Sequence, residues 1–339
     1  MRPLNFALAG CGKIAPRHAM EIVKHGRLKA VCDIIPERAD ALAVSYQANP
    51  YYDLTRLLES EPELDLLVIC TPNGLHASQA KAALEKGLHV LCEKPLCIES
   101  SEGLALIALA EQKQKKAFVV KSTRYNPILQ ALKKEISQNS WGKIYSFQLN
   151  CFWNRPSAYY AGTWRGTALD GGTLYTQFSH YIDALIWLLG DLAHCQGYRQ
   201  NLAHKDSILS EDTGIAALEM ENGVIGGLNW SVNSFQKNME VSLTLLAEKG
   251  SIRIAGEYMD KIDYQLTDSE IRTDELQNAA NDYGFYKGSM SNHDKVYENL
   301  VKALEDPHHP FTDAAEGLRT VEAIEMIYRS LPLKNSQHG

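Results

Sequence analysis

The first 120 residues alternate short apolar runs, which lack a regular alternation of polar and apolar positions, with segments of helical pattern. The apolar runs lie at 5–9, 28–32, 64–70, 89–92 and 117–120, and the helical segments at 14–24, 36–45, 73–86 and 99–114. Strands that are apolar throughout are typical of a parallel sheet covered by helices on both faces. Because the crossover between parallel strands is right-handed, we predict a doubly wound α/β sheet. Ligands bind such sheets at the carboxyl ends of the strands.

The second half of the chain has a different rhythm. Strand patterns lie at 143–153, 194–201, 213–220, 223–232, 239–247 and 250–254, and helix patterns at 174–189, 292–305 and 312–330. Turn signals such as Glu221-Asn222-Gly223 join consecutive strands, which predicts a mainly antiparallel sheet. We therefore expect an α/β domain over 1–122 and an α+β domain over 123–339. We allow for the two C-terminal helices packing back on the first domain.

Charge and composition limit the partners. The chain of 339 residues has 41 acidic and 34 basic side chains, a net charge of -7 that would repel a phosphate backbone, so nucleic acid is not an expected partner. No apolar stretch is long enough to span a membrane, and the N-terminus lacks the apolar stretch of a signal peptide. The seven cysteines form no Cys-x-x-Cys pair, which is typical of a reducing compartment. We expect a soluble, cytoplasmic protein that needs no metal.

A glycine loop directly follows the first predicted strand. Gly10-Cys11-Gly12-Lys13-Ile14-Ala15 matches G-x-G-x-x-G/A. In this pattern the first glycine permits a tight turn, and the second lets the backbone approach a pyrophosphate that the next helix N-terminus attracts. A purely structural turn is the alternative.

The second strand ends at Asp33, 23 residues after Gly10. An acid at this position accepts hydrogen bonds from an adenosine ribose and repels a 2′-phosphate, which favours NAD over NADP. Arg38 lies nearby and weakens this discrimination. Asp33 could instead be a loop acid or cap the following helix.

Polar residues follow two strands at the edge where a cofactor would bind. Thr71, Asn73 and His76 come after the run at 64–70, and Glu93 and Lys94 after the run at 89–92. Asn73 could simply cap a helix, and His76 could be a satisfied helix residue. Lys94 is poorly suited to the end of a buried strand unless it has a partner or a task. We therefore interpret Lys94 as a functional residue.

The helix predicted at 174–189 carries polar residues at helical spacing. Thr176, His180 and Asp183 share or border one face, and most other positions are apolar. A lone histidine on such a face is often a satisfied core residue. As a functional residue, a neutral imidazole near pH 7 would suit a general base.

Several collinear stretches resemble the glucose–fructose oxidoreductase/inositol dehydrogenase/MocA family of NAD(P)-dependent sugar dehydrogenases. They are Ala-Leu-Ala-Gly10-Cys-Gly12-Lys-Ile-Ala, Cys70-Thr-Pro-Asn73-Gly-Leu-His76, Glu93-Lys94-Pro95, Arg124-Tyr-Asn126-Pro and Leu169-Asp-Gly171-Gly172 followed by His180-Tyr-Ile-Asp183. The resemblance implies a Rossmann domain, a second domain with a large open sheet, and a homodimer or homotetramer. It also implies a cis bond between Lys94 and Pro95.

The resemblance assigns catalysis to Lys94 and His180, and Thr176 stands where many members have an aspartate. The stretch from Tyr159 to His180 looks most like members that oxidise UDP-N-acetylglucosaminuronic acid at C3 for surface polysaccharides. Some of these keep NAD bound and reoxidise it with 2-oxoglutarate. The in-class alternative is a dehydrogenase of a free sugar or inositol, and the alternative of another class is a non-catalytic NAD-binding regulator.

We assign His180 as general base and Lys94 as the group that stabilises the reacting oxygen, with the reverse assignment as the alternative. The expected cofactor contacts are Gly10, Gly12, Lys13, Ile14, Asp33, Thr71, Asn73, His76, Glu93, Lys94 and Arg165. The expected substrate contacts are Lys94, Arg124, Asn126, Tyr160, Arg165, Thr176, Gln177 and His180. A diphosphate and a carboxylate call for guanidinium groups. Arg165 could instead reach the cofactor pyrophosphate or a neighbouring subunit.

Overall fold

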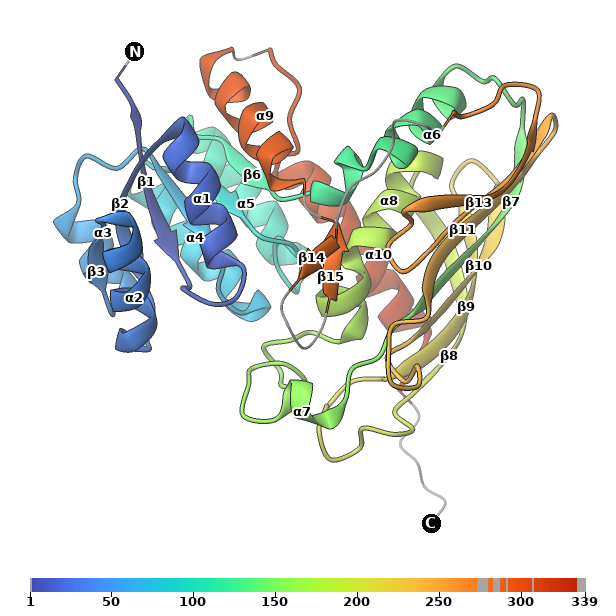
Figure 1. Cartoon of the computed structure of the whole chain (residues 1–339), viewed down its shortest axis with the longest axis horizontal. Coiled ribbons are helices and arrows are strands. Elements are labelled where there is room, and N and C mark those ends of the chain that lie inside the picture. The colour runs from blue at the N-terminus through green and yellow to red at the C-terminus, as the bar shows by residue number, and fades with distance from the viewer. Residues whose placement is uncertain (1, 273–279, 283–286, 291, 307, 334–339) are drawn as a thin grey trace. The chain divides into compact units, whose positions relative to one another are not determined.

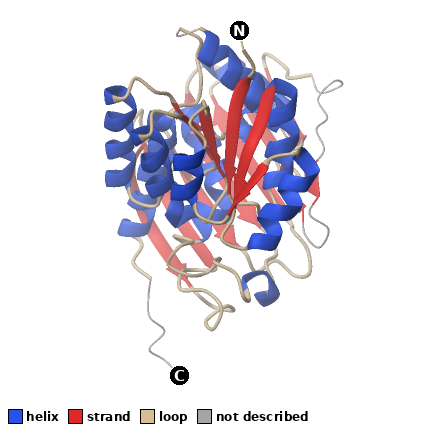
Figure 2. Ribbon diagram, turned by 90° about the vertical axis from the view of Figure 1, so that its left-hand side faces the viewer, coloured by secondary structure: helices blue, strands red, loops and turns tan. Residues whose placement is uncertain are grey.

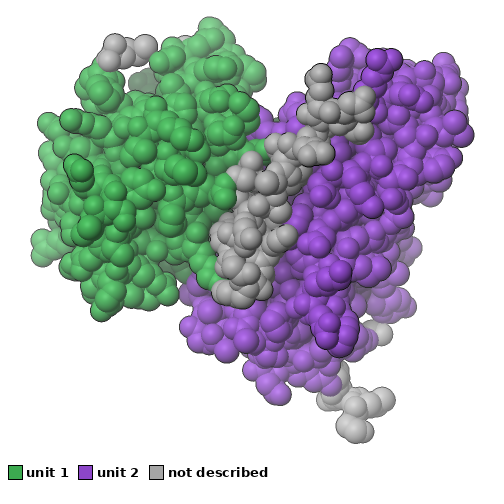
Figure 3. All heavy atoms as spheres, in the orientation of Figure 1, with its two compact units in different colours: residues 1–121, 292–321 green, residues 122–291, 322–339 purple. Residues whose placement is uncertain are grey.

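The structure is a computed structural model that describes residues 2–272, 280–282, 287–290, 292–306 and 308–333. The chain forms two compact units, one of residues 1–121 and 292–321 and the other of residues 122–291 and 322–339 (Figure 3). Each unit has its own sheet. None of the described helices is both long enough and apolar enough to cross a membrane.

The sheet of the first unit has six strands, and every neighbouring pair is parallel. Its order is β3 (Asn49–Tyr51), β2 (Gly26–Cys32), β1 (Leu4–Ala9), β4 (Leu66–Ile69), β5 (His89–Cys92) and β6 (Ala117–Val119). The helices are α1 (Ala15–His25), α2 (Pro36–Tyr46), α3 (Leu54–Ser60), α4 (His76–Glu85), α5 (Ser100–Gln112) and α9 (His293–Glu305), with the short turn η1 (Asn73–Leu75). Figure 2 shows helices on either side of these strands. The predicted doubly wound parallel sheet is confirmed.

The sequence pattern missed β3 and α3. β3 is the edge strand Asn-Pro-Tyr, and none of its residues is buried. An edge strand with a proline has no need of an apolar run, so it leaves no periodic signal.

Strands β1 and β4 lie side by side at the centre of this sheet. From β1 the strand order runs to one edge through β2 and β3, and from β4 it runs to the other edge through β5 and β6, so the order reverses between β1 and β4. This reversal is the position at which doubly wound sheets bind ligands.

The sheet of the second unit has seven strands. Its order is β13 (Lys261–Thr267), β12 (Gly250–Ala255), β11 (Glu240–Ala247), β7 (Ile144–Phe152), β10 (Ile225–Ser231), β9 (Thr213–Met220) and β8 (Leu192–Gln200). All neighbours are antiparallel except β7 and β10, which confirms a mainly antiparallel sheet. The other elements are η2 (Ser122–Tyr125), α6 (Pro127–Ser137), α7 (Ser157–Tyr160), η3 (Leu174–Phe178), α8 (Ser179–Leu189), β14 (Ala280–Asp282) and β15 (Lys287–Met290), and α10 (Ala314–Ser330) runs from the first unit into the second.

The two faces of this sheet differ. Along β9 the side chains alternate, so that Ala216, Leu218 and Met220 are buried while Ile215 is 54% exposed. Helix α8 lies along the buried face (Figure 1), and Trp153 joins the two layers through Phe178 and Tyr181, with ring centroids 5.3 and 5.7 Å apart. One face is therefore core and the other is open.

The helix expected at 174–189 is not uniform. Its first turn, η3, is a π-helix, and the α-helical part α8 begins only at Ser179. The expectation of one continuous α-helix was wrong at this turn. Helix α6 was missed, although the pair Asn126-Pro127 signals its start: the Asn126 side chain accepts hydrogen bonds from Ile128 and Leu129, and proline occupies the first turn.

A buried ion pair ties η2 to α8. The Arg124 Nε and Nη2 atoms each donate to a different carboxylate oxygen of Asp183 at 2.8 Å. Both side chains are buried. A buried charge whose partner is removed keeps the cost of leaving water, so this pair should matter more to stability than any exposed pair.

We expect Asp183→Asn to lower the free energy of unfolding of the second unit by about 3–5 kcal/mol, because it leaves the buried Arg124 charge uncompensated. All five tryptophans lie at 141–230, so their fluorescence during urea denaturation reports this unit. The control is Asp263→Asn, which breaks an exposed pair with Arg253 in the same unit and should cost at most about 1 kcal/mol. Equal effects of the two substitutions would contradict the analysis.

Candidate active site

The glycine loop is clamped by the strands beside it. Gly10 has φ +89° and donates its amide to the Cys32 carbonyl at 2.8 Å. A Cβ at Gly10 would lie 2.7 Å from the backbone of Cys70, whereas a Cβ at Gly12 would meet no atom within 4 Å. Gly10 is thus required by the turn, and Gly12 leaves its backbone open to an incoming group. The N-terminus of α1 follows directly, where exposed amides attract a phosphate.

Asp33 supports this loop from the end of β2. One carboxylate oxygen accepts the Cys11 amide at 2.8 Å, and the other accepts the Ile35 amide at 2.9 Å. Asp33 therefore has the structural role of a loop acid, which the sequence analysis left open as an alternative. A carboxylate offers about four lone-pair positions, so two amide bonds leave capacity for ribose hydroxyls. The loop, the helix N-terminus and Asp33 together fit a dinucleotide.

His76 links the turns that follow β4 and β5. Its Nδ1 lies 2.6 Å from the Pro95 carbonyl oxygen, and its Nε2 lies 2.9 Å from the Thr71 carbonyl oxygen. Burial lowers the pKa of His76, so only one of these contacts carries a proton at neutral pH. Asn73 is buried in η1, and the Thr71 hydroxyl donates to Gln79. These residues brace the turns at the carboxyl edge of the sheet.

Glu93 is the centre of the bracing around Lys94. One of its carboxylate oxygens accepts from His18 Nε2 at 3.0 Å and from His293 Nε2 at 3.3 Å, and the other accepts the Lys94 amide at 3.1 Å. Burial alone would raise the pKa of Glu93, but the two histidines outweigh it and hold the pKa well below its usual value. The Lys94-Pro95 bond is cis, as the resemblance implied, and Lys94 is half-buried.

Sequence reasoning missed His18 and His293, because one lies within α1 and the other begins α9, 275 residues later. Their ligand atoms and that of Glu93 lie within 4.8 Å of one another, a spacing that a divalent cation could bridge. However, a carboxylate only accepts, so each imidazole carries its proton on the nitrogen that faces Glu93. His18 Nδ1 then accepts from the Tyr297 hydroxyl at 2.9 Å. The hydrogen bonds account for the arrangement of Glu93 without a metal.

His180 and Thr176 are the polar positions on the accessible side of their helix. From Gly172 to Leu189 every residue is buried except Thr176, His180 and Trp187. The first two are four positions apart, and the Thr176 hydroxyl donates to the Asp170 carbonyl at 3.3 Å. His180 is half-buried, unlike the fully buried residues on either side of it. Its partial exposure leaves the imidazole within reach of a ligand.

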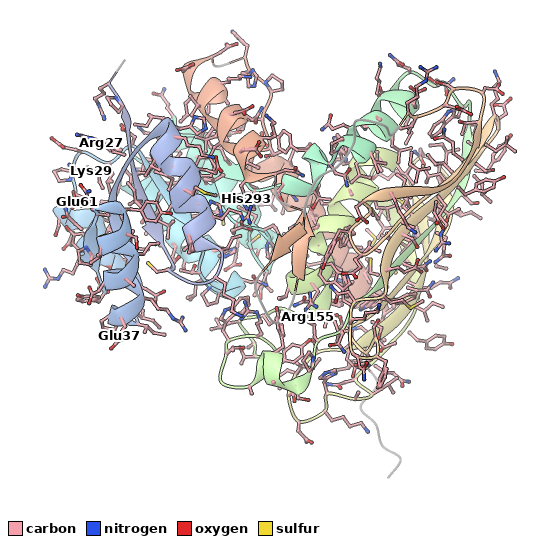
Figure 4. The ribbon with its side chains drawn as sticks, in the orientation of Figure 1. Arg27, Lys29, Glu37, Glu61, Arg155 and His293 are labelled. Atoms are coloured by element: carbon pink, nitrogen blue, oxygen red, sulfur yellow. The ribbon has the colours of Figure 1, made fainter. Side chains whose placement is uncertain are left out.

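Gln177 faces the opposite way, into a buried polar cluster. Its amide oxygen accepts from Arg155 Nε at 2.7 Å, and its amide nitrogen donates to the Tyr159 hydroxyl at 3.0 Å. Arg155, which is labelled in Figure 4, also lies over the rings of Trp153 and Tyr159, at 4.7 and 5.3 Å from their centroids. Sequence analysis did not single out Arg155, and no motif marks it. This cluster connects the helix of His180 to the segment that carries α7.

Two of the predicted substrate contacts extend this cluster. The Arg165 guanidinium lies 4.9 Å from the Tyr159 ring centroid and 5.0 Å from that of Trp164. In the described part of the chain, neither Arg165 Nε nor the buried Tyr160 hydroxyl has a hydrogen-bond partner. Burial raises the pKa of Tyr160, so the hydroxyl keeps its proton and remains a donor. Two adjacent side chains thus hold donors that a bound molecule could satisfy.

Arg124 and Asn126 have structural partners instead. Arg124 is committed to Asp183, as described above. Asn126 is buried, caps α6 through its side-chain oxygen and donates its amide nitrogen to the Met259 carbonyl at 3.0 Å. Their predicted contact with substrate therefore stays a prediction.

A second histidine holds the loop beside Tyr160. His204 Nδ1 donates to Asp212 at 3.2 Å, and Nε2 donates to the Arg155 carbonyl at 2.8 Å. The hydrogen bond to Asp212 raises the pKa of His204, which favours the doubly protonated ring that both bonds require. Asp212 also accepts the amides of Leu202 and Ala203. The pair thereby fixes the loop after β8 against Arg155.

The fold and the glycine loop define a dinucleotide-dependent oxidoreductase. Two family models match the chain, "Oxidoreductase family, NAD-binding Rossmann fold" over residues 4–121 and "Oxidoreductase family, C-terminal alpha/beta domain" over residues 133–334. The chain belongs to the Gfo/Idh/MocA oxidoreductase family, as its sequence motifs indicated, and NAD is the cofactor of this fold.

Solved structures and sequence relatives point to different substrates. The WlbA dehydrogenase of Bordetella pertussis, crystallised with NADH and UDP-GlcNAcA, is 34% identical with a TM-score of 0.87, over 97% of this chain and 96% of that one. The WlbA dehydrogenase of Chromobacterium violaceum, crystallised with the same two molecules, is 35% identical with a TM-score of 0.87, over 97% and 94%. A D-apiose dehydrogenase of Paraburkholderia graminis is 23% identical, over 96% of this chain and 86% of its own length.

The glycine pair separates folding from cofactor binding. Gly10→Ala should lower the stability of the first unit by about 1–3 kcal/mol, because it strains a left-handed backbone against Cys70. Gly12→Ala should leave the melting temperature unchanged but weaken NADH binding by about tenfold, because a methyl group then lies where the pyrophosphate approaches. Calorimetry and NADH fluorescence titration measure the two effects. Unchanged NADH affinity in Gly12→Ala would reject the loop as the pyrophosphate site.

His204 makes the stability of the second unit depend on pH. Its raised pKa means that the stabilisation is complete below the ordinary histidine value, about 6.5, and is lost as the pH rises through the raised value. The difference in unfolding free energy between the parent and His204→Gln should therefore shrink from about pH 6 to pH 8.5. Tryptophan fluorescence in urea reports it, with His194→Gln, at an exposed position of the same unit, as control. A difference that grows with pH would contradict the assigned pair.

Proposed function

We propose that this protein uses NAD to oxidise the C3 hydroxyl of a UDP-linked N-acetyl uronic acid. The observation that carries the proposal is the likeness, at 34–35% identity over nearly the whole chain, to two dehydrogenases crystallised with NADH and UDP-GlcNAcA. A free-sugar dehydrogenase remains the second candidate, since the D-apiose dehydrogenase matches over 96% of the chain.

The substrate region of the second unit supports an anionic ligand. Arg165 and Tyr160 present donors that the described residues do not satisfy, and a buried donor without a partner is costly. A diphosphate or a carboxylate would accept from both. We propose that Arg165 and Tyr160 bind the substrate and that the stacking of Arg165 between Tyr159 and Trp164 keeps its guanidinium plane in place.

The chemistry requires that a hydride and a proton leave the same carbinol. NAD, held at Gly10, Gly12 and Asp33, would supply the acceptor for the hydride. His180 takes the hydroxyl proton, for which a neutral imidazole is suited. Lys94 donates a hydrogen bond to the reacting oxygen and stabilises the negative charge that develops there. The carbinol thus becomes a ketone, and the enzyme must release or reuse NADH.

The threonine at position 176 is consistent with a mechanism in which two groups, His180 and Lys94, carry the proton chemistry. It stands one helical turn before His180, where many family members have an aspartate, and its hydroxyl is bound to the Asp170 carbonyl. A threonine cannot orient or share a proton as a carboxylate does. We infer that His180 and Lys94 carry the proton chemistry without a third charged group. The hydrogen bond from the Lys94 amide to Glu93 fixes the backbone from which the lysine side chain extends.

Absorbance at 340 nm tests the proposal directly. With NAD, the parent protein should reduce the cofactor when UDP-GlcNAcA is added but not when D-apiose or an inositol is added. Added 2-oxoglutarate should allow repeated turnover if NADH is recycled in place. Lys94→Ala and His180→Ala should each lower turnover by about 10²–10⁴-fold while NADH still binds, since each removes a positioned acid–base or electrostatic group.

The matched control is Tyr181→Phe. Tyr181 neighbours His180, but its hydroxyl is buried with no hydrogen-bond partner in the described chain, so its removal breaks no contact. Turnover of a free sugar in place of UDP-GlcNAcA would establish the second candidate. NADH binding without turnover of either substrate class would favour a non-catalytic regulator. Normal turnover in His180→Ala would remove the histidine from the mechanism.

A further inference from the structure

Glu211 is a fully buried carboxylate in the second unit, two residues before the first residue of β9. One of its oxygens accepts from Thr173 Oγ1 at 2.5 Å, from the Tyr328 hydroxyl at 2.8 Å and from Trp230 Nε1 at 3.2 Å. The other accepts from Arg199 Nη1 at 3.1 Å. A buried carboxylate needs such donors to offset its loss of hydration. Two of the four donors, Thr173 and Tyr328, lead to the helix of His180.

Tyr328 connects Glu211 to the first residue of η3. Its hydroxyl donates to Glu211 and accepts the Leu174 amide at 2.9 Å. The first amides of a helix have no partner within the helix. Tyr328, which lies near the end of α10, therefore caps this helix from a distant part of the sequence. Thr173, the residue before η3, binds Glu211 directly, so the same carboxylate holds two consecutive residues at the start of the turn.

The fit around Tyr328 allows little movement. Gly172 has φ +120°, and a Cβ there would lie 2.4 Å from the Tyr328 hydroxyl oxygen. The Arg199 guanidinium lies 4.4 Å from the Tyr328 ring centroid, and the Tyr175 ring contacts its edge at 5.8 Å. Burial and the nearby Glu211 keep the pKa of Tyr328 well above its usual value, so the hydroxyl retains the proton that it donates. The tyrosine is thus held at one face, at its edge and at its hydroxyl.

The turn that these contacts hold has an unusual geometry. A π-helical turn is rare and contains one residue more than an α-helical turn. If η3 relaxed to α-helix, the register between the Gly171-Gly172 loop and the rest of the helix would shift by one residue, a rotation of about 100°. Thr176 lies within η3, and His180 lies two residues after it. The direction of the His180 side chain relative to the loop therefore depends on the π-helical turn.

We propose that Glu211 and Tyr328 form a positioning pair that holds η3 in its π-helical form and thereby aims His180 at the substrate. This inference rests on the proposed role of His180. Neither Glu211 nor Tyr328 touches the reacting atoms in this account. Glu211 acts through Tyr328 and Thr173, and these two act through the start of the helix.

The test is Tyr328→Phe, which removes the hydroxyl and both of its hydrogen bonds but keeps the ring beneath Arg199. The turnover rate with UDP-GlcNAcA should fall about 10- to 100-fold, as expected when a reacting group is displaced by about 1 Å. The KM for NAD should not change, because the first unit is untouched. The rising limb of the pH–rate profile should move, since the surroundings of His180 change. Tyr181→Phe, which removes a hydroxyl without a partner from the same layer, should alter none of these.

A readout without turnover separates this inference from the proposed function. In protein with ¹³C-labelled histidine, the His180 ring signal, assigned with His180→Asn, should shift in Tyr328→Phe and stay in place in Tyr181→Phe. If His180→Asn turns over normally and the His180 signal of Tyr328→Phe still shifts, the proposed catalytic role of His180 is wrong, but the positioning pair is confirmed. If Tyr328→Phe does not fold, Thr173→Val removes one donor to Glu211 and should produce the same changes to a smaller degree. A parental His180 signal, turnover rate and pH profile in the folded variant would overturn the inference.

Discussion

A carboxylate removed from water must be surrounded by hydrogen-bond donors, and this constraint organises the segments that carry the proposed chemistry. Glu93, Asp183, Glu211 and Asp212 are all buried or nearly so. Glu93 and Glu211 collect donors from elements far apart in the sequence, Asp183 takes two from Arg124, and Asp212 takes its donors from the loop at 202–204. Breaking one donor leaves the others attached to a costly charge. Each buried carboxylate therefore holds the segments that supply its donors in a fixed geometry.

In each unit, buried carboxylates hold a different segment of the chain in place. In the first unit, the Glu93 carboxylate binds His18 of α1, His293 of α9 and the amide of Lys94. These bonds hold the backbone of Lys94, the residue proposed to stabilise the reacting oxygen. In the second unit, the adjacent residues Glu211 and Asp212 reach in different directions. Glu211 holds the start of η3, and Asp212 with His204 holds the loop next to Tyr160 and Arg155. The loop next to Tyr160 and Arg155 and the start of the helix of His180 are thus held by neighbouring carboxylates.

The parts of the fold with regular patterns could be predicted from the sequence. Strands β1, β2, β4, β5 and β6 are mainly apolar because both faces of their sheet are covered. Gly10 marks its turn because a side chain at this position would clash with the backbone of Cys70. The edge strand β3 lacks such a run. The π-helical geometry of η3 is invisible to helical periodicity, because it depends on Tyr328, more than 150 residues away.

The same reasoning explains which candidate site residues the sequence singled out. Lys94 and His180 stand in recognisable motifs and at unusual positions, a lysine at the end of a buried strand and a histidine on a mostly apolar helix face. Arg155, His18 and His293 have no such local signal. Their partners, Gln177 and Glu93, are brought to them only by the tertiary fold. A residue that acts by holding another residue can be recognised only when the structure shows the contact between the two.

The most direct test of the proposed chemistry is a crystal structure of the protein with NADH and UDP-GlcNAcA. The account predicts that Lys94 Nζ and a ring nitrogen of His180 both lie within about 3 Å of one hydroxyl oxygen of the sugar, the reach that proton transfer requires. It also predicts that the carbon bearing this hydroxyl is C3 and that it faces the nicotinamide. A complex in which Lys94 and His180 contact different parts of the substrate, or in which another carbon faces the nicotinamide, would contradict it.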